Sequence, residues 1–397
     1  MSPPKLLFLS SGLFAPLLRR SVPVTFLAPQ VAGSVGGSIE GGGDPPQHDT
    51  APVRPDERCD VAALEVCLRG RFPGAEGPLV IEQFPSGYSN LTYLLRFGER
   101  EFVLRRPPLG PLPPKAHDMA REHRVLDALW RFFPPAPRPY LLCEDPSIIG
   151  APFFVMERRA GVVIRRELPP HWAHDPGVCR LISETLVDVM AELHAVDWRA
   201  AGLHDLGRPE GFMARQVRGW TDRWERAKDR EIPALTDLSR WLADRVPVPS
   251  DATLVHGDLK LDNVMLDPQD PARVVAVLDW EMCTTGDPLA DLGILLGYWA
   301  EAKDPLARQE SVLQVTALPG FYTRAELVKR YATQTGRDVS KIAFYEAFAL
   351  FKIAVVIQQI YIRWKRGQTK DERFGLLAPR VEALAQAALE LADRSGL

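Results

Sequence analysis

The sequence has 397 residues and a formal net charge of −3, with 46% hydrophobic and 25% charged residues. These values are ordinary for a globular protein, and they exclude a fully disordered or collagen-like chain. The near-neutral charge also argues against a nucleic-acid binder, which usually carries a strong basic excess. The length allows two or three domains, or one large unit of two lobes.

The cysteine pattern indicates a protein of a reducing compartment. The five cysteines are scattered and no two of them form a C-x-x-C pair, which predicts neither a disulfide framework nor a zinc site. We therefore expect a cytoplasmic protein. Beyond the N-terminus no apolar stretch reaches about 20 residues, so no membrane-spanning helix is expected.

Residues 1–55 differ in composition from the rest and are predicted to be a disordered leader and linker. An apolar run at 6–17 is flanked by basic residues, a pattern compatible with a signal peptide or a mitochondrial-type targeting segment. An unstructured extension or a wrongly assigned start codon is the interpretation we favour. Residues 33–47 are rich in glycine, which is typical of a flexible linker.

From residue 56 the pattern is that of a folded domain, and its first part is rich in strands. Strands are predicted at 79–84, 91–97, 101–105 and 152–157. Helical spacing of apolar residues predicts helices at 57–69 and 118–131. We therefore expect residues 56–157 to form a small β-rich N-lobe.

The second part is mostly helical. Helices are predicted at 176–196, 212–228, 234–245, 288–300, 323–335, 340–366 and 375–394. One strand pair, 264–266 and 274–278, interrupts them. Because the strands come first and the helices follow, we predict an α+β chain with two segregated lobes, of which residues 158–397 form the larger, helical C-lobe.

Three polar residues near this strand pair carry the strongest chemical signal. Asn263 lies at the start of one strand and Asp279 at the end of the other. If the strands pair antiparallel, an amide oxygen and a carboxylate meet there, which suits Mg²⁺ together with phosphate oxygens. Asp258 can face the same point and accept the proton of an attacking hydroxyl. We predict that Asp258 is catalytic and that Asn263 and Asp279 hold the metal.

This H-x-D-x-x-x-x-N pattern, followed by a hairpin and Asp, resembles the catalytic segment of kinase-like enzymes. Its HGD form, with Gly257 where protein kinases have Arg, resembles the aminoglycoside phosphotransferase (choline kinase-like) superfamily. The missing Arg argues against control by a phosphorylated activation loop. We expect His256 and Asp291 to brace the loop, and Asp287 before Pro288 to cap a helix.

Upstream segments resemble the nucleotide-binding parts of the same superfamily. In the loop PSGYSN, donors to phosphate would come from Ser86, Gly87, Ser89 and Asn90. The loop has one glycine instead of the full G-x-G-x-x-G pattern, and an ordinary hairpin turn has the same composition.

The strand FVLRRP would direct a cation into the cleft. Strand alternation puts Val103 and Arg105 on one face, and the resemblance gives Arg105 the place of the phosphate-binding lysine of protein kinases. Glu122 on the next helix is its expected partner. Arg106 is expected at the surface.

The segment FFVMERRAG resembles the interlobe hinge of kinases. By that resemblance, the backbone around Glu157 and Arg159 would hydrogen-bond adenine. Val103 and Met156 would line the base.

Longer strings, among them SGYSNLTYLL, IIGAPFFVMERRAG and VAVLDWEMCTTGDPLADLG, resemble the kinase-type domain of acyl-CoA dehydrogenase family members 10 and 11 and bacterial phosphotransferase family proteins. The resemblance covers residues 57–397. It implies a protein kinase-like fold, use of ATP and Mg²⁺, and phosphoryl transfer to a hydroxyl of a small molecule. DWE replaces DFG, so no DFG-type switch is expected, and Glu281 is a candidate for a further metal contact.

The acceptor is predicted from the charge of the last helices. Segment 351–370 carries Lys352, Arg363, Lys365, Arg366 and Lys370. These residues favour an anionic or amphipathic acceptor over a polycation, although a solvated helix face explains them as well. The fused relatives imply hydroxyacyl thioesters of coenzyme A.

Three other functions stay open at this level. One is an antibiotic kinase of the aminoglycoside or macrolide type. A nucleotide-binding pseudokinase or scaffold is disfavoured because Asp258, Asn263 and Asp279 are all present. A protein kinase is disfavoured because the chain lacks an APE-like segment.

Overall fold

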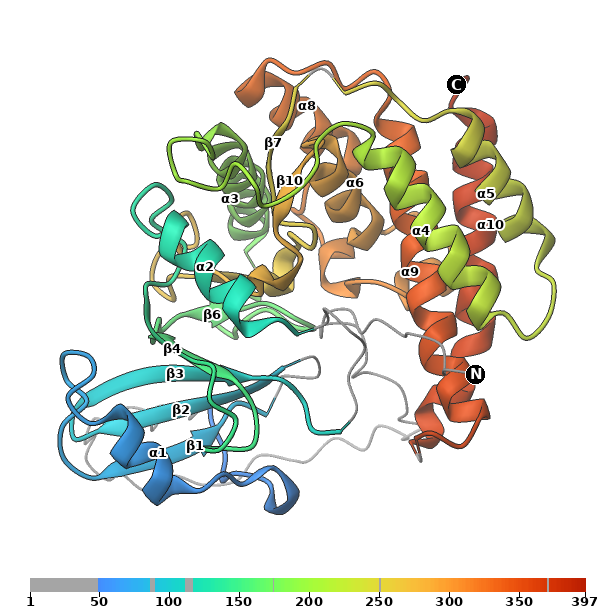
Figure 1. The fold of residues 1–397 in the computed structure, drawn as a ribbon. Helices are drawn as coiled ribbons and strands as arrows, with labels where there is room; N and C mark the ends of the chain where they lie inside the picture. The colour runs from blue at the N-terminus through green and yellow to red at the C-terminus, as the bar shows by residue number, and fades with distance from the viewer. Residues whose placement is uncertain (1–48, 86–89, 111–116, 174, 250, 370) are drawn as a thin grey trace, which may run out of the picture.

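The computed structural model describes residues 49–85, 90–110, 117–173, 175–249, 251–369 and 371–397. In this part of the chain, a sheet of five strands has the order β1-β2-β3-β5-β4, with every neighbouring pair antiparallel (Figure 1). Its strands are β1 (Leu79–Gln83), β2 (Leu91–Phe97), β3 (Arg100–Arg106), β4 (Pro139–Cys143) and β5 (Phe153–Glu157). Two helices accompany the sheet, α1 (Val61–Leu68) and α2 (Met119–Leu129). The predicted strands and helices of this part are confirmed, whereas β4 was not predicted.

The two faces of the sheet pack into different cores because successive side chains of a strand point to opposite sides. On β3, Phe102 and Leu104 join a cluster that includes Leu64 and Leu68 of α1. Val103 instead joins the large cluster that runs through α2 into the helical part. The inner face of the sheet is therefore fixed to the rest of the protein, and Arg105, two residues after Val103, lies on that same face.

The expectation for Arg106 was wrong. Its side chain is 4% exposed, and its guanidinium donates a hydrogen bond of 2.7 Å to the carbonyl of Ile149. Arg106 is on the same face as Leu104, so strand alternation places it in the outer core, where the carbonyl of Ile149 accepts a hydrogen bond from it.

The helical part follows the sheet in the chain and lies beside it in space (Figure 1). Its helices are α3 (Pro176–Ala195), α4 (Phe212–Ala227), α5 (Pro233–Asp244), α6 (Leu289–Tyr298), α7 (Leu306–Gln309), α8 (Arg324–Thr335), α9 (Ile342–Lys365) and α10 (Ala378–Arg394). All seven predicted helices of this part are found, and the short α7 is additional. The α+β plan predicted from the element order is confirmed.

Helix α9 is the central element of the helical part. It packs against α4, α6 and α10. Among the described residues it is the one helix long and apolar enough to cross a membrane by length and composition, but 89% of its apolar window is buried inside the protein. Its hydrophobicity therefore belongs to a core helix.

Two small sheets accompany the large sheet. One pairs β6 (Val162–Val163), β8 (Val264–Leu266) and β9 (Val274–Val277), and the other pairs β7 (Thr253–Val255) with β10 (Thr284–Gly286). In β8 and β9, Val264 lies opposite Val277 in an antiparallel register. The start of β8 and the end of β9 therefore adjoin, as the sequence predicted.

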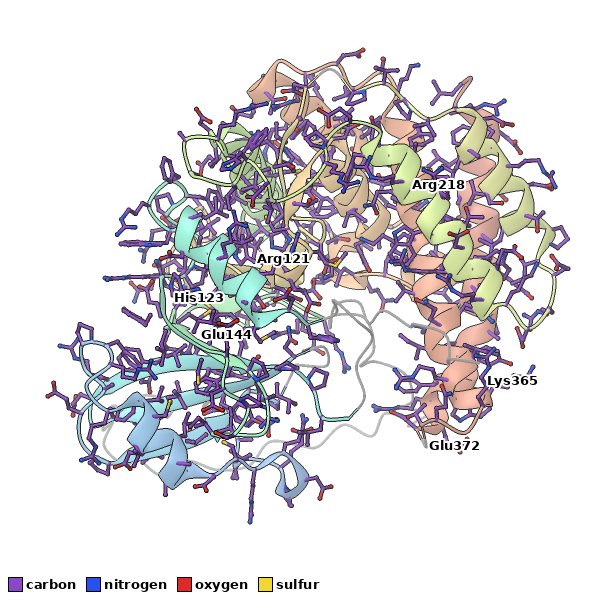
Figure 2. All side chains as sticks on the ribbon, in the orientation of Figure 1. Arg121, His123, Glu144, Arg218, Lys365 and Glu372 are labelled. Carbon is purple, nitrogen blue, oxygen red and sulfur yellow. The ribbon has the colours of Figure 1, made fainter. Side chains whose placement is uncertain are left out.

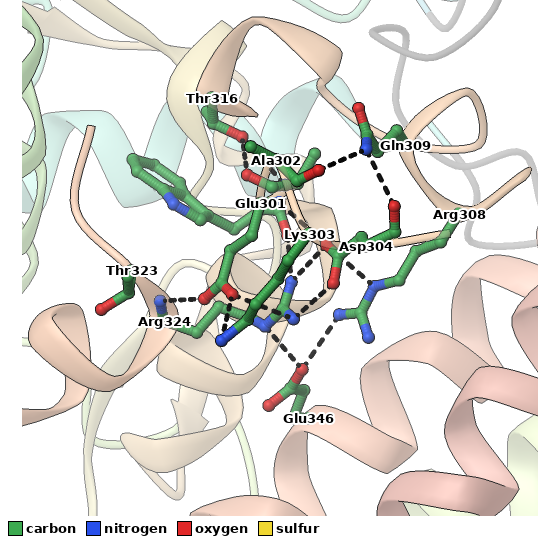
Figure 3. Close-up of polar contacts among 12 residues, drawn as sticks. Glu301, Ala302, Lys303, Asp304, Arg308, Gln309, Thr316, Thr323, Arg324 and Glu346 are labelled. Carbon is green, nitrogen blue, oxygen red and sulfur yellow. Dashed lines mark hydrogen bonds and ion pairs between the residues drawn. The ribbon is translucent and has the colours of Figure 1, made fainter. Parts of the chain in front are cut away.

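A buried cluster of ionic side chains holds the segment after α6 against α8 and α9 (Figure 3). Arg324 pairs with Asp304 at 2.7 Å and with Glu346 of α9 at 3.3 Å. Arg308 pairs with the same Glu346 at 3.0 Å. Each buried charge thus has an opposite charge beside it, which is the condition for tolerating it in the interior.

Candidate active site

The loop between β7 and β8 is held rigidly from α6. Both carboxylate oxygens of Asp291 accept backbone N–H groups, from His256 at 2.6 Å and from Gly257 at 2.7 Å. Burial would raise the pKa of Asp291, but the hydrogen bonds from His194 and the His256 backbone outweigh it and lower the pKa. The side chain of His256 lies 3.0 Å from the carbonyl of Leu278. The bracing roles predicted for Asp291 and His256 are confirmed.

Gly257 is required at its position by backbone geometry. Its φ is +81°, and a Cβ added there would lie 2.9 Å from the carbonyl oxygen of Met282. A side chain would therefore be strained and would also displace the segment after Asp279.

The carboxylate of Asp258 lies between two side chains of its own loop. One of its oxygens accepts hydrogen bonds from Lys260 at 2.6 Å and from the amide of Asn263 at 3.0 Å. The amide also donates to the Asp258 carbonyl at 2.9 Å. Because the amide nitrogen of Asn263 donates to Asp258, the side-chain oxygen of Asn263 points away from Asp258. The structure therefore brings Asp258 and Asn263 together, as predicted.

Sequence reasoning missed Lys260. Its side chain is fully buried between Asp258 and Asp262, with its ammonium 5.3 Å from the ring centre of Tyr298. Burial would lower the pKa of Lys260, but the two carboxylates raise it. In the sequence, Lys260 is recognisable only as a lysine two residues after Asp258. Its contact with both carboxylates depends on burial, which no local pattern reveals.

Arg105 joins the sheet to the segment after β9. Its guanidinium pairs with Glu122 of α2 and with Asp279, both at 3.1 Å. The predicted partner Glu122 is confirmed, and Asp279 is an additional one. Asp279 has a φ of +69°, a strained conformation for a residue other than glycine. Burial and the negative charge of Glu281 raise the pKa of Asp279 to about 6, against the attraction of Arg105.

Glu281, whose role the sequence left open, connects three elements. It accepts a hydrogen bond of 3.0 Å from the amide of Asn90, and its carboxylate lies 3.5 Å from the ring of His117. His117 in turn lies 2.9 Å from Asn90. Arg121 of α2, labelled in Figure 2, donates to the backbone carbonyls of Glu281 at 2.9 Å and of Cys283 at 2.5 Å. The turn after Asp279 is therefore tied to β2 and to α2.

A cavity of about 340 Å³ opens between the large sheet and these loops. The predicted site residues that line it are Asn90, Val103, Arg105, Met156, Glu157, Arg159, Asn263 and Asp279. Asp258 and Glu122 are not among its lining residues, although they contact Asn263 and Arg105 respectively. The predicted Ser86, Gly87 and Ser89 lie outside the described residues. Lining residues that the sequence analysis did not single out include Phe84, Arg158, Arg165 and Asp262.

The segment after β5 forms one wall of the cavity. The N–H of Glu157 donates to the carbonyl of Arg138 at 2.8 Å, so it is already engaged within the protein. The side chain of Arg159 pairs with Glu157 at 2.9 Å and reaches the carbonyl of Val275 at 3.2 Å. This pairing holds the segment against β9, next to Asp279.

Comparison with known proteins identifies the family to which this architecture belongs. The model of the phosphotransferase enzyme family APH matches residues 80–325, which include every residue that lines the cavity except Asp49. The chain is a member of this phosphotransferase family. The resemblance seen in the sequence is thereby confirmed, and the family is one of ATP-dependent kinases.

Among curated proteins, the chain is 36% identical to acyl-CoA dehydrogenase family member 11 of Rattus norvegicus and 35% identical to family member 10 of Mus musculus. Each match covers 88% of this chain, but 45% of the first protein and 32% of the second. The chain therefore spans less than half the length of these relatives.

Solved structures confirm the kinase-like fold. A protein of Ralstonia eutropha, provisionally named an aminoglycoside phosphotransferase, is 34% identical with a TM-score of 0.72, over 85% of this chain and 99% of that one. Aminoglycoside phosphotransferase APH(4)-Ia, in a ternary complex with ADP and hygromycin B, is 17% identical with a TM-score of 0.53, over 84% of this chain and 99% of its own. The N-terminal antiparallel sheet followed by a helical region is common to these proteins.

Proposed function

We propose that the protein transfers the γ-phosphoryl group of ATP to a hydroxyl of a small molecule. One observation carries this proposal: Asn263 lines the cavity and also donates a hydrogen bond to Asp258. A nucleotide in the cavity would thus lie on one side of Asn263, and a hydroxyl oriented by Asp258 on the other. This arrangement brings donor and acceptor together, which is the main requirement of phosphoryl transfer.

Each side chain then has a role that its contacts support. Asp258 would orient the hydroxyl and take its proton, and the ion pair with Lys260 at 2.6 Å holds that carboxylate in place. Arg105 would bind the phosphates, with Glu122 holding its guanidinium in place. Val103 and Met156 would contact the base. Since the N–H of Glu157 is engaged with Arg138, the backbone donor to adenine would be that of Arg159.

Ser86, Gly87 and Ser89 are proposed to cover the phosphates on the basis of their sequence. Asn90, which ends the same loop, lies in the cavity and is held by Glu281 and His117. This anchoring supports a place for Asn90 beside the bound nucleotide.

The donor set fits a magnesium ion. Asn263 would contribute an amide oxygen whose orientation follows from its engaged nitrogen. Asp279 would contribute a buried carboxylate, and its pKa is raised by burial and by the negative charge of Glu281, two effects that a bound cation would offset. Asn263 and Asp279 would therefore hold Mg²⁺, which when bound neutralises charge on the transferred phosphoryl group. Glu281 points its carboxylate to Asn90 and His117, which supports a positioning role.

The acceptor is proposed to be anionic or amphipathic, such as a hydroxyacyl thioester of coenzyme A. The names of the curated relatives support an acyl-CoA connection, because both are acyl-CoA dehydrogenase family members. Of the basic residues of α9, Lys365 is exposed and pairs with Asp229 at 2.6 Å (Figure 2), whereas Lys352 is buried beside the catalytic loop. The proposal of an anionic acceptor therefore depends on the charge of Lys352 more than on the basic residues at the C-terminal end of α9.

An antibiotic kinase is the second candidate, supported by the provisional name of the Ralstonia protein. The two candidates predict acceptors of opposite charge. An acidic pocket would be needed for cationic aminoglycosides.

The test is a screen of ATP consumption with the purified chain, Mg²⁺ and hydroxyl acceptors of four classes: hydroxyacyl-CoA, sugars, amino alcohols and antibiotics. We expect turnover with an anionic class, and loss of at least 100-fold in kcat for Asp258→Asn with unchanged AMP-PNP affinity. Turnover restricted to antibiotics would favour the second candidate. AMP-PNP binding without transfer to any class would favour a pseudokinase.

A further inference from the structure

Helix α9 also contacts the loop that carries Asp258, in addition to the contact from Asp291 of α6. The ammonium of Lys352 donates a hydrogen bond of 3.0 Å to the carbonyl of Gly257, the residue next to Asp258. Lys352 is 9% exposed and is not among the residues that line the cavity. It therefore reaches the catalytic loop from the helical side, where an acceptor must approach if the nucleotide occupies the cavity.

A second cation lies close to Lys352. The guanidinium of Arg223, on α4, is 4.6 Å from the ring centre of the buried Trp220, and the ammonium of Lys352 is 5.6 Å from the same ring. Helices α4 and α9 pack together (Figure 1). Two cations from two helices thus share one aromatic side chain.

These two cations lack the carboxylate partners that other basic residues of the site have. In the described part of the chain, neither Arg223 nor Lys352 forms an ion pair, whereas Lys260 has two carboxylates within 3.3 Å. Arg223 donates instead to the carbonyl of Gly219 at 3.0 Å.

The pKa shifts of Arg223 and Lys352 agree with the absence of carboxylate partners beside them among the residues that the structure describes. Burial lowers the pKa of both Arg223 and Lys352, and the charge of Arg223 lowers that of Lys352 further. Asp258 and Asp291 act on Lys352 in the opposite direction and more strongly than Arg223, whereas Lys260 also lowers the pKa of Lys352. Two like charges in a poorly solvated place are unfavourable by themselves, and an anion between them would relieve the repulsion.

We propose that Arg223 and Lys352, against Trp220, form a subsite for a carboxylate or phosphate group of the acceptor, near the hydroxyl that faces Asp258. This inference rests on the proposed function and defines its acceptor class. A cationic group of the acceptor, close to its hydroxyl, would be repelled by Arg223 and Lys352.

The test compares Arg223→Gln and Lys352→Gln with Arg218→Gln, a matched change of an exposed arginine on α4 (Figure 2). The probes are a short hydroxycarboxylate and its neutral amide, assayed as acceptors with the full chain. We expect Arg223→Gln to raise KM for the carboxylate at least tenfold with kcat within threefold, and to leave the KM of the amide and AMP-PNP affinity unchanged. Lys352→Gln should also lower kcat, and Lys352→Arg should restore both. Equal KM changes for Arg223→Gln and Arg218→Gln would overturn the subsite.

A second measurement separates this inference from the proposed function. If neither probe is phosphorylated, inorganic phosphate is titrated calorimetrically into the chain with AMP-PNP and Mg²⁺ present, so that the nucleotide site is filled. Saturable phosphate binding that Arg223→Gln weakens at least tenfold would support the subsite even if the chain transfers no phosphoryl group. Absence of phosphate binding, or binding that is unchanged in Arg223→Gln, would refute it.

Discussion

Replacing Asp291 by Asn tests the reasoning about the catalytic loop. Both carboxylate oxygens accept backbone N–H groups of that loop at 2.6 and 2.7 Å, and one also lies 3.2 Å from His194. Asn keeps the shape but has one acceptor oxygen, so an NH₂ group would face a backbone N–H. The variant therefore loses one hydrogen bond to a charged group and leaves a buried donor without a partner.

The magnitude follows from these contacts. A hydrogen bond to a charged group contributes about 1.5–3 kcal/mol, and an unsatisfied buried group costs about 1–3 kcal/mol. We expect Asp291→Asn to lower the free energy of unfolding by about 3–5 kcal/mol, a large part of the total stability of a protein. Urea unfolding followed by fluorescence measures the change, with the exposed Asp393→Asn as the control.

The same residue predicts a pH dependence. The pKa of Asp291 is lower in the folded protein than its ordinary value, so its contribution is present above the unfolded pKa of about 3.9 and is lost as pH falls through the folded pKa. Asp291→Asn should therefore flatten the acid side of the stability curve. The reasoning would be refuted if the variant were within 1 kcal/mol of the wild type at neutral pH and kept the same acid dependence.

Two further changes test other parts of the structure. Arg105→Gln removes the cation that pairs with Glu122 and Asp279, so AMP-PNP affinity measured by calorimetry should fall at least tenfold, and an unchanged Kd would contradict its phosphate-binding role. Arg324→Met leaves Asp304 and Glu346 with fewer partners in a buried cluster, so thermal or urea unfolding should show a loss of about 3–5 kcal/mol. A loss below 1 kcal/mol would mean that the cluster is well solvated.

Much of the candidate site was predictable because its residues are close in the chain. Asp258 and Asn263 belong to one loop, and the antiparallel pairing of β8 and β9 brings Asp279 to them. Strand alternation placed Arg105 on the inner face of the sheet.

Other parts had no local signal. The strands β7 and β10 have three residues each and are buried or nearly so, so they show no alternation of polar and apolar positions. Strand β4 begins at Pro139, the last residue of the proline-rich stretch 134–139, and proline disfavours the prediction of a strand. Arginine is usually found at the protein surface. The burial of Arg106 against Ile149 depends on a loop more than 40 residues away in the chain.

The sequence by itself predicted the family, most of the strands and helices in their order, and the candidate catalytic and metal-binding side chains, because each depends on spacing within a short segment. Tertiary structure decided which charges are neutralised. Lys260 lies between two carboxylates of its own loop, whereas Lys352 and Arg223 meet over Trp220 although they come from helices more than 100 residues apart. The energy of a charge depends on its burial and on its neighbours in space, and neither is encoded in local sequence.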